Sequence, residues 1–177
     1  MEKLLKEDRF KFISLENKMF ISEFTKILNT LGYDFGGEIG NGFCWGNYMI
    51  IYSQKGVKSK KVIARIYIRD KGIIIWGGKE YKFNNGIVLR LFFNNIDKHL
   101  EYIKNASSII KKPFINKDGI CNHCKKNCRM RKTYTINGKE YIKCSGIVFE
   151  YNNPKIENLN EYIEIIKEFY IKSNKKK

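Results

Sequence analysis

The sequence contains little of what enzymes and membrane proteins usually depend on. Only two of its 177 residues are histidines, His99 and His123, so catalytic arrangements with a histidine base have few candidates. The chain has neither the Gly-x-x-x-x-Gly-Lys-Ser/Thr phosphate-binding loop nor a dinucleotide-binding glycine motif. The complete signature of zinc nucleobase deaminases, which ends in Pro-Cys-x-x-Cys, is absent as well. We expect His99 to face solvent or cap a helix, and we expect the protein not to be an enzyme.

Long apolar runs are missing too. The longest, 72–78 and 48–52, are far too short to span a lipid bilayer. Charged residues recur every two or three positions near the N-terminus, so no apolar signal core is found there. We therefore expect a cytoplasmic protein that does not associate with a membrane and whose thiols stay reduced.

Acidic residues are few compared with basic ones. The chain has 18 Asp and Glu residues and 34 Lys and Arg residues, which gives a formal net charge of +16. Residues 1–38 carry six basic and seven acidic side chains, whereas residues 111–143 carry ten basic and two acidic ones. This field favours nucleic acid or another acidic macromolecule as a partner. The alternative is a lysine-rich surface that serves only solubility.

The rest of the composition is that of a folded protein. Hydrophobic residues make up 43% and aromatic residues 14% of the chain, which excludes wholesale disorder. The length suits one domain or two small ones. Abundant Ile, Lys and Asn indicate an AT-rich genome, bacterial or phage.

Four of the five cysteines form one cluster with the spacing C-x2-C-x3-C-x15-C. A Cys-x-x-Cys segment can direct two thiolates to one tetrahedral ion, and a second pair of thiolates closes the site. Residues 132–143 alternate around Asn137-Gly138, a strong hairpin signal that would return the last cysteine towards the third. We predict a structural zinc ion bound by Cys121, Cys124, Cys128 and Cys144.

Other interpretations of the cluster stay open. An iron–sulfur cluster also uses four thiolates and is the second choice. Two disulfides would need an oxidising compartment, and a redox dithiol would leave two cysteines unexplained. His123 can replace one cysteine as a ligand, although a position in solvent or beside the site is expected. We interpret Cys44, between Phe43 and Trp45, as a small buried apolar residue.

The periodicity of apolar residues predicts an α+β fold with a mainly antiparallel sheet and helices on one face. Helices are expected at about 21–31, from about 96 to Pro113 and from Pro154 to about 169. Strands are expected at 47–53, 61–69, 73–76, 86–93 and 146–151, in addition to the hairpin of 132–143. We divide the chain into a charged N-terminal arm (1–19), an α+β half (20–115) and a metal-knuckle half (116–177), packed as one domain.

The sequence repeats itself at a distance of 60 residues. Without a gap, 78–103 and 138–163 share 11 of 26 residues, including Gly-Lys-Glu-Tyr and Gly-Ile-Val. We interpret the repeat as a duplicated ββα unit, in which only the second copy carries the cysteine cluster. The alternative is coincidence in a chain rich in Ile, Lys, Asn, Tyr and Gly.

Two sets of basic and aromatic residues are candidates for contacting nucleic acid. If strands 61–69 and 86–93 are neighbours, the first set shares a sheet face on which cations hold phosphates and rings stack on bases. The second set lies in and after the cysteine loop, on a knuckle that the metal would stiffen. The first set is Lys61, Arg65, Tyr67, Arg69, Arg90 and Phe92, and the second is Lys125, Lys126, Arg129, Arg131 and Lys132. The alternative for the sheet face is that a helix covers it and its aromatic rings belong to the core.

From Arg65 onward the chain also resembles a group of small bacterial proteins that are uncharacterised. The resemblance rests on 86–93, 98–103, the cysteine stretch with 131–136, 144–150 and 168–170, and covers about two thirds of the chain. It implies that the cysteines belong together, and it implies no activity. Relative to that pattern, 76–85 is an insertion, which counts against the duplication.

The sequence thus predicts a non-catalytic, zinc-stabilised protein that binds an anionic partner, nucleic acid before others. One alternative is a protein-binding inhibitor or adaptor, for example one encoded by a mobile element or phage, that docks on an acidic or nucleoprotein surface. The other is a small-molecule sensor domain with its ligand between the two copies.

Overall fold

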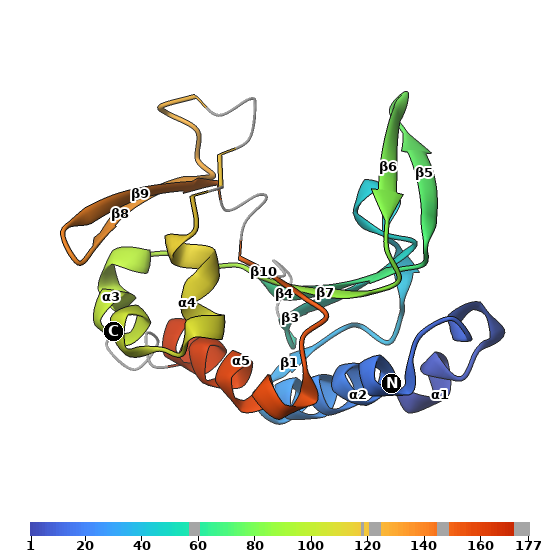
Figure 1. The fold of residues 1–177 in the computed structure, drawn as a ribbon. Helices are drawn as coiled ribbons and strands as arrows, with labels where there is room; N and C mark the ends of the chain where they lie inside the picture. Colours follow the sequence, from blue (N-terminus) through green and yellow to red (C-terminus); the bar gives the residue numbers. More distant parts are fainter. Residues whose placement is uncertain (57–60, 118, 121–124, 145–148, 172–177) are drawn as a thin grey trace. The chain divides into compact units, whose positions relative to one another are not determined.

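The computed structural model describes residues 1–56, 61–117, 119–120, 125–144 and 149–171 (Figure 1). The chain forms two compact units that alternate along the sequence. Unit 1 comprises Met1–Arg90 and Tyr151–Leu159, and unit 2 comprises Leu91–Glu150 and Asn160–Lys177. The sequence analysis had instead divided the chain into consecutive segments.

The helical layer of unit 1 consists of α1 (Glu2–Leu5), a 3-10 turn η1 (Asp8–Phe10) and α2 (Leu15–Thr30). Ser14 caps α2, because its hydroxyl accepts a hydrogen bond from the Asn17 amide at 3.2 Å. The helix ends before Gly32, whose φ of +87° suits glycine. Leu5 and Phe10 are buried, so residues 1–19 belong to the core of unit 1 and are no detached arm.

The central sheet is mainly antiparallel, as predicted, and has the strand order β1-β3-β4-β7-β10 with β2 added beside β3. Its strands are β1 (Tyr33–Asp34), β2 (Gly40–Asn41), β3 (Tyr48–Gln54), β4 (Val62–Arg69), β7 (Gly86–Leu91) and β10 (Glu150–Asn152). One face of β3 packs on α2, where the Tyr52 hydroxyl lies 2.7 Å from the Thr25 hydroxyl and the Tyr52 ring meets Phe24 edge-on. This contact fixes which face of the sheet is core and which face lies opposite the helix.

The end of β10 comes very close to the start of β7. The Asn153 amide donates to the Ile87 carbonyl at 2.8 Å, and the Asn153 side-chain oxygen accepts from the Ile87 amide at 3.0 Å. A Cβ atom at Gly86 would lie only 2.0 Å from that oxygen, so the close approach requires glycine.

A separate hairpin, β5 (Gly72–Trp76) and β6 (Lys79–Phe83), projects from the sheet of unit 1 (Figure 1). Gly77 and Gly78 form its turn with φ values of +57° and +75°. Two successive residues with positive φ are the pattern of a type I′ turn, whose twist matches that of the two strands.

Unit 2 packs short helices around an aromatic core. Its elements are η3 (Ile96–His99), α3 (Leu100–Asn105), α4 (Ser108–Ile115), β8 (Arg131–Ile136), β9 (Lys139–Cys144), most of α5 (Leu159–Ile166) and the final π-helical turn η5 (Lys167–Ile171); η4 (Ile156–Asn158), just before α5, belongs to unit 1. The Phe93 ring lies 5.3 Å from Phe114, 5.1 Å from Phe149 and 4.4 Å from Phe169.

The single helix predicted from 96 to 113 is broken in two. Ala106 is extended (ψ 160°), and Ser107 starts a new helix by accepting from the Ile110 amide. Pro113 lies inside α4, which continues to Ile115, so the expectation that proline ends the helix was wrong.

Candidate metal centre and nucleic-acid interface

The hairpin β8–β9 has the predicted position and turn. Asn137 and Gly138 have φ values of +51° and +75°, and Ile136 pairs with Lys139 across them. The same register pairs Arg131 with Cys144 at the open end of the hairpin. Cys144 is therefore held at a defined place beside the start of β8, and its side chain is buried.

The chain on both sides of the cysteine loop returns to this open end. The Arg131 amide donates to the Cys128 carbonyl at 2.9 Å, so a tight turn connects Cys128 to the residue opposite Cys144. The Cys144 amide donates to the carbonyl of Gly119, which comes two residues before Cys121, at 2.5 Å. Backbone hydrogen bonds thus gather the approaches of the predicted metal ligands at one end of one hairpin.

Half of the predicted ligand set can be described. Cys121 and Cys124, together with His123, lie outside the described residues. Cys128 is half-buried, Cys144 is buried, and Cys44 in unit 1 is buried as expected. Within the described ranges, no group of three or more His, Cys, Asp or Glu side chains is arranged to hold a metal ion. The donor chemistry, two described thiols with two more in the intervening loop, fits zinc.

The predicted cations of the knuckle lie on its outer side. Lys125, Lys126 and Arg129 are exposed, and Arg131 and Lys132 are half-buried at the start of β8. Lys143 on the partner strand is buried, and its ammonium group donates to the Asn116 carbonyl at 2.5 Å. The segment 125–132 therefore presents five cations and no acidic side chain, whereas Lys143 serves the core.

The predicted sheet face is partly covered. Strands β4 and β7 are neighbours, as predicted, and Arg90 donates to the Tyr67 hydroxyl at 3.0 Å. The Trp45 ring stacks on Tyr67 at 6.0 Å, and the Arg90 guanidinium carbon lies 4.7 Å from the Trp45 ring. Tyr67 is 0% and Arg90 2% exposed, so neither side chain reaches a base or a phosphate.

The cover comes from the 3-10 turn η2 (Phe43–Trp45) rather than from the helix considered above. The Trp45 carbonyl accepts from the Arg69 side chain at 2.8 Å, which fastens this turn to β4. The sequence gives no signal for the contact, because Trp45 lies in a glycine-rich stretch without periodicity.

The remaining predicted residues of this set are divided between the two units. Lys61 is exposed at the start of β4, and Arg65 and Arg69 are half-buried further along the strand. Phe92 follows β7 and belongs to unit 2. The structure therefore groups Lys61, Arg65 and Arg69 on one strand and does not extend the group to Phe92.

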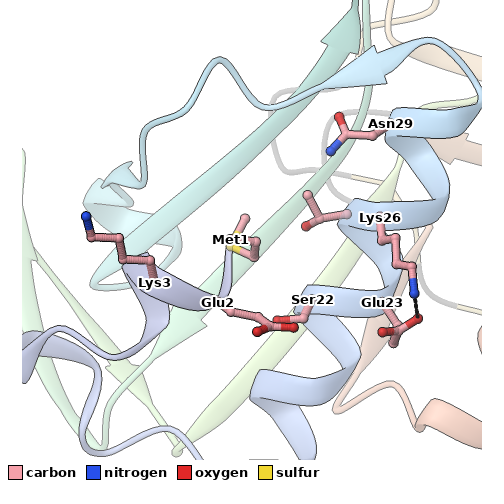
Figure 2. Close-up of a pocket in the computed structure, with 8 residues that line it drawn as sticks. Met1, Glu2, Lys3, Ser22, Glu23, Lys26 and Asn29 are labelled. Atoms are coloured by element: carbon pink, nitrogen blue, oxygen red, sulfur yellow. Dashed lines mark ion pairs between the residues drawn. The ribbon is translucent and has the colours of Figure 1, made fainter.

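The pockets show no catalytic arrangement among the described residues. Figure 2 shows a pocket of about 490 Å³ in unit 1 between α1 and α2, where Lys26 pairs with Glu23 at 3.7 Å. Its lining mixes basic and acidic side chains with Ser22 and Asn29. No histidine or cysteine lies among the lining residues, so the lining offers no nucleophile with a histidine base.

A second pocket, of about 640 Å³, lies in unit 2 and is acidic. Glu101, Glu161 and Glu164 line it together with Tyr102. Burial, together with the negative charges of Glu164, Glu168 and Glu161, raises the pKa of Tyr102 to about 12. A pocket of this charge repels phosphates and does not suit an anionic ligand.

His99 differs from the expectation of a solvent-facing or capping side chain. It is 8% exposed, its Nδ1 atom lies 3.1 Å from a carboxylate oxygen of Glu168, and its ring lies 4.1 Å from that of Phe169. The aromatic core of unit 2 overrides the local pattern, so His99 is part of the packing.

No helix in the part of the chain that the structure describes has the length and apolar character needed to cross a membrane. No family model, curated protein or solved structure matches the chain.

Proposed function

We propose that this protein is a non-catalytic nucleic-acid-binding protein whose second unit is held together by a structural zinc ion. The zinc ligands are Cys121, Cys124, Cys128 and Cys144. The cations of the knuckle contact phosphates from the outer side of the metal site.

The zinc site is supported by the backbone around it. Cys144 is hydrogen-bonded to Gly119 and lies opposite Arg131, which is itself hydrogen-bonded to Cys128. Four thiolates would complete a closed tetrahedral site, and a closed site leaves no position for substrate. Its role is to tie the loop to the hairpin, which lowers the entropy lost when the loop binds a partner.

One observation carries the assignment to nucleic acid: five cations and no acid occupy residues 125–132, and three of the five side chains are exposed. A short, stiff, purely basic loop holds its charges close together, and such charges displace the counterions of a phosphate backbone. The acidic pocket of unit 2 and the ion pairs of α2 do not offer this chemistry.

The duplicated unit is supported by geometry as well as by sequence. Displaced by 60 residues, β5–β6 coincides with β8–β9, and the turn pairs Trp76 with Lys79 in one hairpin and Ile136 with Lys139 in the other. Both turns have two residues with positive φ, and each copy continues into a 3-10 turn at Ile96 or Ile156 and then a helix. We infer that each copy is a hairpin, a sheet strand and a helix.

The test is binding to mixed-sequence single- and double-stranded DNA and RNA at about 50 and 200 mM salt. A triple variant, Lys125→Gln, Lys126→Gln and Arg129→Gln, should weaken binding to all sequences. It should also flatten the salt dependence by about 0.7–0.9 logarithmic units for each phosphate that it no longer neutralises. The matched control is Lys3→Gln, Lys11→Gln and Lys26→Gln, which removes the same charge from the helical layer of unit 1.

The proposal fails if the wild-type protein does not bind at the lower salt concentration. It fails equally if the two triple variants lose the same affinity, because net charge alone would then explain the binding. A complex with a protein that persists at high salt would favour the adaptor function instead.

A further inference from the structure

The hairpin β5–β6 exposes large apolar side chains that the rest of unit 1 does not cover. Ile73 is 56%, Ile75 71% and Trp76 52% exposed. An isolated two-stranded hairpin is at best marginally stable in water, and exposed apolar side chains in one place indicate a contact surface. The feature is independent of the cysteine knuckle, which lies in unit 2.

The cross-strand register divides this hairpin into two different faces. Ile74 pairs with Tyr81, Trp76 with Lys79 and Gly72 with Phe83, so the side chains of these pairs share one face. We call the face made by Ile74, Trp76, Lys79, Tyr81 and Phe83 the aromatic face. The other face carries Ile73, Ile75, Glu80 and Lys82. The aromatic face thus has three rings from base to tip, and the only acid of the two strands lies on the other face.

The equivalent face of the second hairpin is buried. There Tyr134 and Ile136 are each 3% exposed, and the Tyr134 hydroxyl donates to the Phe114 carbonyl of α4 at 2.8 Å. The corresponding residues of the first hairpin are Ile74, which is half-buried, and Trp76, which is mostly exposed. The same hairpin therefore uses this face for packing in unit 2 and leaves its outer end open in unit 1.

The base of the hairpin is fixed and its tip is open. The Asp70 amide donates to the Asn47 side chain at 2.7 Å, the Lys71 amide donates to the Asn85 side chain, and the Arg69 guanidinium lies 5.1 Å from the Phe83 ring. At the tip, a Cβ atom built on Gly77 or Gly78 would meet no other atom within 4 Å. Aromatic rings on such a support lose little conformational entropy when they bind.

Charge identifies the occupant of the aromatic face. A net charge of +16 opposes a contact with a second copy of the chain, whereas it attracts a polyanion. The exposed ring of Trp76 is paired with the exposed side chain of Lys79, and Arg69 lies at the other end of the row. Rings on a strand recur about every 7 Å on one face. A row of rings with cations at both ends is the arrangement that stacks unpaired bases and holds the phosphates between them.

The geometry points to the aromatic face as a binding site for single-stranded nucleic acid, with Trp76 and Tyr81 stacking on bases and Lys79 contacting a phosphate. This assignment rests on the proposed function and adds to it the strand type and the surface of unit 1 that recognises it. DNA and RNA share this chemistry, and the test includes both.

The test compares Trp76→Ala, Trp76→Phe and Ile75→Ala for binding to single-stranded DNA, single-stranded RNA and duplex DNA. Trp76→Ala should weaken single-strand binding about five-fold or more, because a stacked ring contributes about 1–3 kcal/mol per base. Duplex binding, which uses the knuckle cations, should change less than about two-fold. Trp76→Phe retains a ring and should recover most of the affinity. Ile75→Ala lies at the same tip on the other face and should behave as wild type.

The outcomes separate this assignment from the proposed function. If wild type binds single strands and Trp76→Ala binds them equally well, the aromatic face is not the site, while the knuckle assignment stands. If Ile75→Ala loses as much as Trp76→Ala, the tip acts as an apolar wedge and stacking is wrong. If wild type sediments as a dimer that Trp76→Ala dissociates, the face binds a second copy. If wild type binds no nucleic acid, both assignments fall together.

Discussion

The two hairpins of this protein have the same register and the same kind of turn, yet they differ in what their faces contact. In β8–β9 the face of Tyr134 and Ile136 is buried, and the open end of the hairpin carries Cys144. In β5–β6 the equivalent face presents Trp76 to solvent, and Asn84 occupies the position that corresponds to Cys144. The difference indicates a division of roles, in which one hairpin holds a metal and core and the other meets a partner.

The side chains at equivalent positions explain this difference. The β-branched Ile136 fits a packed surface, whereas the large ring of Trp76 beside Lys79 suits a surface that is only covered during binding. Lys143, buried in the second hairpin, corresponds to Phe83 in the first, where Arg69 stacks on the ring instead. Duplication followed by divergence of a few such positions is sufficient to produce both surfaces.

The largest effect should come from removing a metal ligand of the second hairpin. Cys144→Ser should abolish stoichiometric zinc binding and lower the melting temperature by about 10 °C or more, because a structural zinc site contributes much of the folding free energy around it. Metal content per chain and thermal unfolding measure both effects. The control is Cys44→Ala, which removes a buried thiol from unit 1 and should leave the zinc in place.

Retention of one zinc ion per chain by Cys144→Ser would show that the ligands are misassigned. Visible absorption of the purified wild-type protein would identify an iron–sulfur cluster in place of zinc.

The next effect compares the two positions at the ends of the hairpins. Ile136→Ala should destabilise the protein by about 2–4 kcal/mol, because it leaves a cavity in the core of unit 2. Trp76→Ala should cost less than about 1 kcal/mol, since half of the ring is already exposed. Urea unfolding of both variants measures the difference. Equal losses would show that the aromatic face is packed as tightly as its counterpart.

The sequence was informative where local chemistry decides the structure. Asn137-Gly138 predicted the second hairpin and its register, and the alternation in 61–69 and 86–93 predicted neighbouring strands. Local chemistry could not reveal the cover of Tyr67 by Trp45 or the burial of His99, because both depend on residues distant in the chain. The break at Ala106 was missed for the same reason. Burial of Leu5 and Phe10 likewise depends on contacts that a charged, irregular segment does not announce.

A smaller effect concerns two tyrosines at equivalent positions of the two copies. Burial, together with the negative charge of Glu161, raises the pKa of both Tyr102 and Tyr162 to about 12. The folded state thus favours the neutral phenol, so this contribution to stability is complete below the unfolded pKa of about 10 and is lost as pH rises towards 12. Melting temperatures measured from pH 9 to about 11.5 should fall less steeply for Tyr102→Phe with Tyr162→Phe than for wild type. Identical slopes would contradict the assignment.

The smallest effect tests whether the turns are interchangeable. Gly77→Asn copies the Asn-Gly turn of the second hairpin, and Gly77 already has nearly the φ of Asn137. Because a Cβ atom at Gly77 has open space, the variant should be neutral or more stable by about 0.4–1 kcal/mol. Gly77→Val is the control and should destabilise, since a β-branched residue resists positive φ. If the urea midpoints of both variants fall equally, the turns differ.

The central claim is that one hairpin region holds the metal and cationic loop while the other contributes rings to the same partner. Amide hydrogen exchange of the zinc-loaded protein, with and without a single-stranded oligonucleotide, tests it most directly. The account predicts slower exchange on binding in 72–83 and in 125–132, with no change in α2. Protection confined to α2, or to neither of the two hairpin regions, would contradict it.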